Sequence, residues 1–145
     1  MSDDRKVFVD TNVFVYLFDR SAPAKRERAR RLIEAENAGR GLVISTQVLQ
    51  EFHVSVTRKL EVPLSPAEAE KAARNLTALQ VIGVDTGMVL DAIVRSREHK
   101  LAFWDALIVQ AALAGGCSAL LSEDLQHGRE FGALRIENPF RTLSS

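Results

Sequence analysis

Short apolar segments and stretches with a helical repeat alternate along the whole chain. Apolar runs bounded by turn-forming residues predict four buried strands and a fifth candidate, at Val7–Val9, Leu42–Ile44, Val81–Val84, Ala119–Leu121 and Leu134–Ile136. The intervening stretches predict helices, at Asn12–Phe18, Ser21–Ala38, Thr46–Leu60, Pro66–Leu79, through Met88–Ile93 and at Asp105–Ala114. Short apolar strands separated by helices predict an α/β fold, with a central, mostly parallel sheet of 4–5 strands flanked by helices on both faces.

Local signals mark several ends of these helices. Residues 65–68, Ser-Pro-Ala-Glu, form a capping box with proline at the first helical position. Gly39 and Gly41 are expected to stop the second helix, and Gly115 and Gly116 to close the last one. No repeat, low-complexity tract or Pro/Gly-rich linker divides the 145 residues, so we expect a single domain over residues 1–145.

Two carboxylates follow predicted strands near the point where each strand ends. Asp10 comes directly after Val7–Val9, and Asp124 comes shortly after Ala119–Leu121. The carboxyl ends of parallel strands meet at one edge of a sheet, and ligands of such folds bind there. We therefore expect Asp10 and Asp124 to face the same rim.

Two further carboxylates occupy unusual positions on predicted helices. Asp105 begins a helix that is otherwise almost entirely apolar, directly after Phe103 and Trp104. Glu51 lies on the flank of the apolar stripe of its helix, beside Ser55, because successive helical residues are about 100° apart. Both positions are compatible with side chains that reach the same rim as the two strand-end acids.

Each of the four acids also has a structural interpretation. Asp10 and Asp105 are suited to cap helices, Asp124 suits a turn, and Glu51 alone suits a solvated helix face. Their convergence favours a functional interpretation, because four neighbouring anions repel one another unless a cation or protonation offsets their charge. The chain has no thiol or imidazole cluster, so a hard ion such as Mg²⁺ or Mn²⁺ is expected. Auxiliary oxygen-bearing side chains follow two of the strands: Thr11, Asn12 and Ser122.

These local signatures together resemble the PIN-domain pattern. The matching segments are residues 10–12 (Asp-Thr-Asn), 45–52 (Ser-Thr-Gln-Val-Leu-Gln-Glu-Phe), 103–107 (Phe-Trp-Asp-Ala-Leu) and 122–125 (Ser-Glu-Asp-Leu). The resemblance spans residues 7 to about 136, and the chain is similar in length to VapC-type toxins of prokaryotic toxin–antitoxin modules. By position, the resemblance implies an acidic, metal-binding and catalytic quartet with an auxiliary polar group: Asp10, Glu51, Asp105 and Asp124, with Asn12.

The resemblance implies a metal-dependent endoribonuclease that cleaves RNA with a metal-activated water. The expected cofactor is Mg²⁺ or Mn²⁺, and the expected partners are an RNA substrate, a cognate antitoxin and a second copy in a homodimer. The alternative is a catalytically silent PIN-like module that binds RNA or acts as a scaffold, although such a module has no need of all four acids. A haloacid-dehalogenase-type phosphatase needs a second aspartate where this chain has Asn12, and no glycine-rich nucleotide-binding motif occurs.

Composition adds an expected location. Hydrophobic residues make up 46% of the chain and charged residues 26%, which is ordinary for a globular protein, and the 19 basic residues balance the 19 acidic ones. The single cysteine, Cys117, cannot form an internal disulfide, and the first residues lack the apolar block of a signal peptide. No apolar run reaches the roughly 18 residues of a membrane span. We therefore expect a cytoplasmic protein that does not enter a membrane.

Four other features admit more than one interpretation. Glu123 could tune the site or face solvent, and His127, three residues after Asp124, could approach the rim. We expect Trp104 to anchor the core rather than to stack on a base. The basic run at residues 25–31 predicts either a solvated helix face or a local edge that contacts phosphates.

Overall fold

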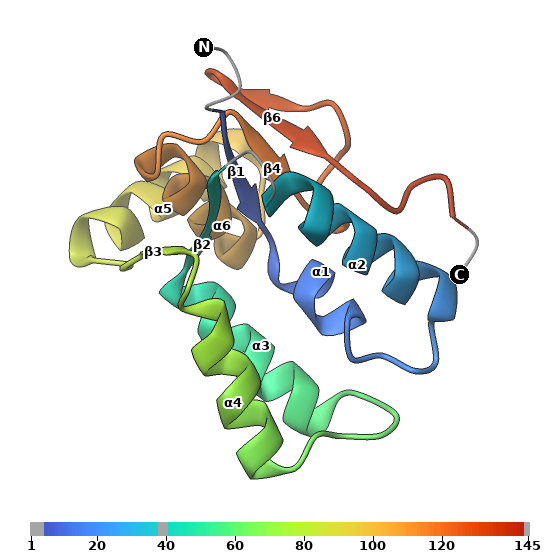
Figure 1. The fold of residues 1–145 in the computed structure, drawn as a ribbon. Helices are drawn as coiled ribbons and strands as arrows, with labels where there is room; N and C mark the ends of the chain where they lie inside the picture. Colours follow the sequence, from blue (N-terminus) through green and yellow to red (C-terminus); the bar gives the residue numbers. More distant parts are fainter. Residues whose placement is uncertain (1–4, 38–40, 144–145) are drawn as a thin grey trace.

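A six-stranded sheet forms the centre of residues 5–37 and 41–143, which the computed structural model describes (Figure 1). The strands are β1 (Lys6–Val9), β2 (Gly41–Ser45), β3 (Gln80–Ile82), β4 (Ala119–Leu121), β5 (Glu130–Phe131) and β6 (Leu134–Glu137). Their order across the sheet is β3-β2-β1-β4-β6-β5. Neighbouring strands are parallel except for β5 and β6, which pair antiparallel.

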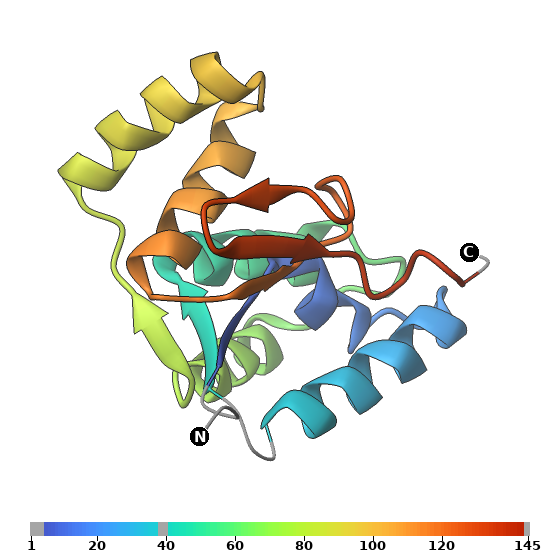
Figure 2. The same ribbon diagram turned by 90° about the horizontal axis from the view of Figure 1, so that it is seen from above.

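Six helices in the described part of the chain connect and cover these strands. They are α1 (Thr11–Tyr16), α2 (Pro23–Asn37), α3 (Thr46–Arg58), α4 (Pro66–Leu76), α5 (Thr86–His99) and α6 (Phe103–Ala114). Figure 2 shows α5 and α6 on one side of the central strands and α2 on the other. In Figure 1, α3 and α4 lie side by side. The predicted α/β class, with a mostly parallel sheet between layers of helices, is confirmed.

The apolar strands form the core, as their sequences predict. In β1, Val7, Phe8 and Val9 have no exposed surface, because β2 and β4 flank the strand and helices cover its two faces. The apolar residues of β2 and β4 are likewise buried. No helix within residues 5–37 and 41–143 combines the length and the apolar character needed to cross a membrane.

Parallel pairing brings the ends of β1, β2 and β4 to one edge of the sheet. Val9 is paired with Leu121, and the backbone N–H of Asp10 extends this ladder by donating to the Leu121 carbonyl at 2.9 Å. Helices α1 and α3 begin directly after β1 and β2, so their first turns lie at this same edge (Figure 1). The edge is therefore the rim at which the predicted acids should meet.

The sheet differs from its prediction at its two edges. It contains six strands rather than 4–5, because the two-residue β5 is completed by pairing with β6, where Glu130 faces Arg135 and Phe131 faces Leu134. A two-residue strand has too little periodicity to be recognised by itself. At the other edge, β3 covers Gln80–Ile82 rather than 81–84.

The helices differ from their predictions at several ends. The last helix begins at Phe103 and not at Asp105. The second begins at Pro23 rather than residue 21, and Gly41 begins β2 instead of stopping this helix. The predicted end at residues 38 and 39 lies outside the described residues. The capping box is confirmed, since the Ser65 hydroxyl accepts from the Glu68 N–H and the Glu68 carboxylate accepts from the Ser65 N–H.

Candidate active site

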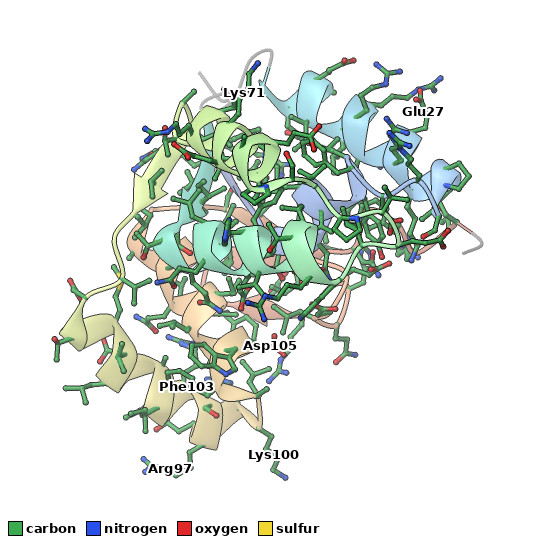
Figure 3. The ribbon with its side chains drawn as sticks, turned by 90° about the horizontal axis from the view of Figure 1, so that it is seen from below. Glu27, Lys71, Arg97, Lys100, Phe103 and Asp105 are labelled. Atoms are coloured by element: carbon green, nitrogen blue, oxygen red, sulfur yellow. The ribbon has the colours of Figure 1, made fainter. Side chains whose placement is uncertain are left out.

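The four predicted acids come from four elements that end or begin at the same rim. Asp10 follows β1, Glu51 lies on α3, Asp124 lies in the turn after β4, and Asp105 lies in the first turn of α6. Asp10, Glu51 and Asp124 line a single cleft of about 470 Å³. Asp105 directly follows Trp104, another residue of the cleft wall, and Figure 3 shows it near α3.

Asp10 is the most buried of the four, with 6% of its surface exposed. Its carboxylate accepts hydrogen bonds from the Thr11 N–H at 2.7 Å and from the Ser122 hydroxyl at 2.8 Å. It is therefore the N-cap of α1, which confirms the capping interpretation, and its position in the cleft is compatible with a role in the site as well. Burial raises the pKa of Asp10 to about 7 and outweighs the two hydrogen bonds, and the charges of Asp124 and Glu51 add to the increase.

Glu51 is held on both carboxylate oxygens rather than solvated. The Thr11 hydroxyl donates to Oε1 at 2.7 Å, and the Gln47 Nε2 donates to Oε2 at 3.0 Å. Gln47 lies one turn before Glu51 on α3, is only 3% exposed, and also donates to the carbonyl of Trp104 at 3.1 Å. Sequence reasoning did not single out Gln47, although its spacing of four residues from Glu51 was a usable signal.

Two of the three auxiliary residues, Asn12 and Ser122, form hydrogen bonds with acids of the rim. The Asn12 Nδ2 donates to the Asp124 carboxylate at 3.1 Å. Ser122 is fully buried; its hydroxyl donates to Asp10 and accepts from the backbone N–H of Asp124 at 3.2 Å. Burial raises the pKa of Asp124, the charges of Glu123 and Glu51 raise it further, and the bond from Asn12 opposes this.

Asp105 is not a helix cap. The N-cap position of α6 is Ala102, and no side chain caps this helix end. Asp105 is the third residue of the helix, and burial together with the charges of Asp124 and Glu51 raises the pKa of its carboxyl group. Asp105 therefore interacts with the acids of the cleft although it does not line the cleft itself.

The chemistry of these donors fits a hard divalent cation. All the candidate ligands are oxygens, and mutual repulsion contributes to the raised pKa of three of the four acids. Within residues 5–37 and 41–143, no three Asp, Glu, His or Cys side chains form a ready-made metal cluster. Instead, hydrogen bonds from neutral side chains orient the carboxylates of Asp10, Glu51 and Asp124. The donors are the side chains of Thr11, Gln47, Asn12 and Ser122.

Three side chains near the rim have roles that the sequence left open or misassigned. Glu123 accepts hydrogen bonds from the Tyr16 hydroxyl at 2.5 Å and from the Lys25 ammonium at 2.6 Å, so it anchors the turn after β4 to α1 and α2. The His127 Nδ1 accepts from the Asn138 N–H, and His127 lines a different depression from the acids. The prediction that Trp104 anchors the core is wrong: it is 61% exposed.

Two residues of the basic run on α2, Arg30 and Arg31, are ion-paired along their own helix. Glu27, labelled in Figure 3, accepts from Arg30 and Arg31 at 2.7 Å each, and Arg30 also contacts Glu34 at 3.0 Å. These pairs are the i,i+3 and i,i+4 contacts expected on an exposed helix surface. The solvated-face interpretation accounts for them, whereas Lys25 points to Glu123 at the rim.

Comparison with known proteins agrees with the fold. The sequence model of the family described as "PIN domain" matches residues 7–129. Comparison with the curated proteins found no match.

Several solved structures have a similar fold. A toxin–antitoxin complex from Klebsiella pneumoniae has a TM-score of 0.68 and 18% identity, covering 92% of this chain and 97% of that chain. VapC20 of Mycobacterium tuberculosis, described as a sarcin-ricin loop cleaving toxin, has a TM-score of 0.62 and 22% identity, covering 81% and 91%. VapBC2 from Rickettsia felis, bound to a DNA fragment from its promoter, has a TM-score of 0.65 and 16% identity, covering 92% and 98%.

Proposed function

The chain belongs to the PIN domain family, and from this premise we propose that it is a metal-dependent endoribonuclease, the toxin of a type II toxin–antitoxin system. The observation that carries the proposal is the convergence of four carboxylates from four elements at one rim, three of them in one cleft. The burial of Asp10 supports it further. A buried carboxylate beside other acids destabilises the fold, and ionisable groups perturbed in this way cluster at functional sites. The similar fold of structures described as toxins and toxin–antitoxin complexes supports the biological assignment.

The residues that would hold Mg²⁺ or Mn²⁺ are the acidic quartet Asp10, Glu51, Asp105 and Asp124. When bound, such an ion lowers the pKa of a coordinated water and offsets the charge of the scissile phosphate. The neutral donors around the quartet orient it: Thr11 and Gln47 each bind one oxygen of Glu51, so this carboxylate has a fixed plane. Fixed carboxylates need little rearrangement during the reaction, which is how preorganised polar groups accelerate it.

Ser122 and Asn12 fix the other side of the site. Through its hydroxyl, Ser122 couples the position of Asp10 to the backbone of Asp124. Asn12 couples α1 to the Asp124 carboxylate. The pairing of β1 with β4 holds Asp10 and Asp124 next to each other, because each acid follows one of these two neighbouring strands.

The proposed protein partner is a small antitoxin that covers the acidic rim. Without a cation, the carboxylates of the quartet attract a basic side chain, and an arginine can bind a carboxylate through two parallel hydrogen bonds. Such a contact would block the cleft to RNA. A homodimer of this chain also remains part of the proposal.

The test is cleavage of RNA by the purified protein. Total cellular RNA is incubated with Mg²⁺ or with EDTA, and new RNA ends are mapped. We expect new RNA ends that form only with Mg²⁺. For Asp10→Asn, the rate at which these ends form should fall by several orders of magnitude. Asp91→Asn, which removes an exposed carboxylate from α5, serves as the matched control and should cleave as the wild type does. Absence of metal-dependent ends with folded wild-type protein would contradict the nuclease and favour a catalytically silent RNA-binding module.

A further inference from the structure

The only tryptophan of the chain lies on the wall of the cleft that contains the acids. Trp104 is 61% exposed. Tryptophan side chains usually bury 150–250 Å² of surface and are highly buried on average, so a largely exposed one forgoes much stabilisation. Core packing therefore does not account for a tryptophan at this position.

The backbone of Trp104, a residue of the cleft wall, is fixed relative to the acids. The Trp104 carbonyl accepts from the Gln47 Nε2 at 3.1 Å, and the same nitrogen donates to Glu51. The ring of Phe103 meets the indole edge to face, with centroids 5.0 Å apart and planes at 75°. Figure 3 shows Phe103 beside Asp105 in the first turn of α6. The indole therefore packs against Phe103 and belongs to the residue directly before an acid of the quartet.

The cleft continues from the acids along one side of α3. Its wall includes residues 47, 50, 51, 54 and 55, which recur every three or four positions, and it ends at residue 59. Twelve residues of helix rise about 18 Å, so the wall is longer than the acidic site alone needs. Val54 is 45% exposed on this wall, and Gln50 and Ser55 add polar groups.

A cation lies at the far end of this wall. Lys59 is exposed, and within residues 5–37 and 41–143 it has no acidic partner. The cleft therefore presents acids at one end, an aromatic face beside them, and a free ammonium group beyond. A nucleic acid needs these groups: a metal-loaded acid site for one phosphate, a stacking surface for a base, and a cation for a second phosphate.

Building on the proposed ribonuclease function, we propose that Trp104 is a stacking platform for one unpaired base of single-stranded RNA. The RNA strand follows α3 from the acids towards Lys59. Stacking on an aromatic ring tolerates any base, because every base has a π-face, so this subsite selects unpaired structure rather than sequence. A base inside a duplex is already stacked on its neighbours and cannot occupy the platform without unstacking.

Tryptophan emission tests the stack directly, because Trp104 is the only source of it. The Asp10→Asn variant, for which we expect cleavage to be lost, is titrated in Mg²⁺ with a single-stranded RNA octamer, with the same octamer in a duplex, and with inorganic polyphosphate, which has charge but no bases. We expect saturable quenching by the single strand and much weaker quenching by the other two. Absence of saturable binding of the single strand, or binding that leaves the emission unchanged, would overturn the platform.

Two substitutions separate stacking from general apolar contact. Trp104→Leu keeps an apolar side chain without a ring, and Trp104→Phe keeps a ring. Measured by anisotropy of labelled octamer, we expect Trp104→Leu to weaken binding about tenfold or more and Trp104→Phe to weaken it less. The control is Leu90→Ala, which truncates a 57% exposed residue of α5 outside the cleft and should leave binding unchanged. Equal losses for the leucine and phenylalanine variants would contradict stacking.

Sedimentation distinguishes RNA from protein as the occupant of this face. If the emission of RNA-free protein depends on its concentration and Trp104→Leu lowers the assembly mass, then Trp104 belongs to a contact between copies and the platform is wrong.

The stacking proposal and the nuclease proposal also fail separately. Metal-dependent cleavage without quenching would leave the nuclease and remove the platform, whereas quenching without cleavage would leave an RNA-binding face and remove the nuclease.

Discussion

Removing the charge of Asp10 should make the stability of the metal-free protein less dependent on pH in a defined window. Burial raises the pKa of Asp10 from the ordinary 3.8 to about 7 in the folded protein. The folded state therefore keeps a proton that the unfolded chain releases, so this group destabilises the fold as the pH rises from about 4 to above 7. Asp10→Asn stays uncharged throughout, so its stability should not fall in this window for this reason.

The magnitude follows from the size of the pKa shift. About three units at about 1.4 kcal/mol each give a cost of about 4 kcal/mol once the pH exceeds the folded pKa. The part of this cost that develops between pH 5 and pH 8 is about 2.5 kcal/mol. Because Asp10 is only 6% exposed, solvent screens little of the effect. This is a large fraction of the stability of an ordinary domain.

The assay is urea unfolding in EDTA at several values between pH 5 and pH 8, for wild type and Asp10→Asn. The readout is the change with pH of the difference between the two free energies of unfolding. The substitution also alters the hydrogen bonds to Thr11 and Ser122, which shifts the difference in free energy of unfolding by a constant amount. This constant does not affect how the difference changes with pH. Acids that do not interact with Asp10 titrate equally in both proteins and cancel, whereas the interaction of Asp10 with neighbouring acids is part of the measured difference. Asp91→Asn, at an exposed position on α5, should run parallel to the wild type.

Parallel curves for wild type and Asp10→Asn would refute the reasoning. They would mean that Asp10 is ionised at the same pH in both states, so neither burial nor the neighbouring acids disfavour its charge. A slope of the opposite sign would mean that the hydrogen bonds from Thr11 and Ser122 outweigh the burial.

Three other perturbations follow from the same geometry. Asp105→Asn should raise the melting temperature of metal-free protein at neutral pH while abolishing cleavage, because it removes one of several repelling charges; a lower melting temperature would show that this carboxylate mainly stabilises the start of α6. Mg²⁺ at one hundred times its dissociation constant should stabilise the wild type by about 2.7 kcal/mol, and an unchanged thermal melt would argue against the cation. Lys25→Met should lower the free energy of unfolding in urea by about 1–3 kcal/mol, because it leaves the part-buried Glu123 without its cation, whereas the exposed Lys71→Met should have little effect.

The sequence determined the elements and the edge of the sheet at which the acids would meet. Apolar runs bounded by turns identified four of the six strands and the candidate fifth, which is β6. The capping box at residues 65–68 could be predicted because both of its hydrogen bonds join residues only three positions apart. The positions of Asp10 and Asp124 relative to the rim follow from strand ends in a parallel sheet, which is a local signal combined with a general rule.

Features that depend on a neighbour far along the chain could not be predicted in this way. The two-residue β5 is a strand only because β6 pairs with it. Gln47 is buried and Trp104 is exposed because of how α3 and α6 pack. By residue type alone, glutamine is expected to be exposed and tryptophan to be buried. The structure also shows that Glu123 accepts hydrogen bonds from Tyr16 and Lys25, which are 107 and 98 residues away along the chain. The sequence left the role of Glu123 open.

The sequence by itself placed four acids at one rim, but only the tertiary structure decided their partners and charge states. Ser122 and Asp10 are 112 residues apart and Thr11 and Glu51 are 40 apart, yet each pair shares a hydrogen bond. The raised pKa of Asp10 comes first from the protein packed around it. Loss of solvent and hydrogen-bond geometry depend on which atoms surround a group in space, and spacing along the chain does not encode that.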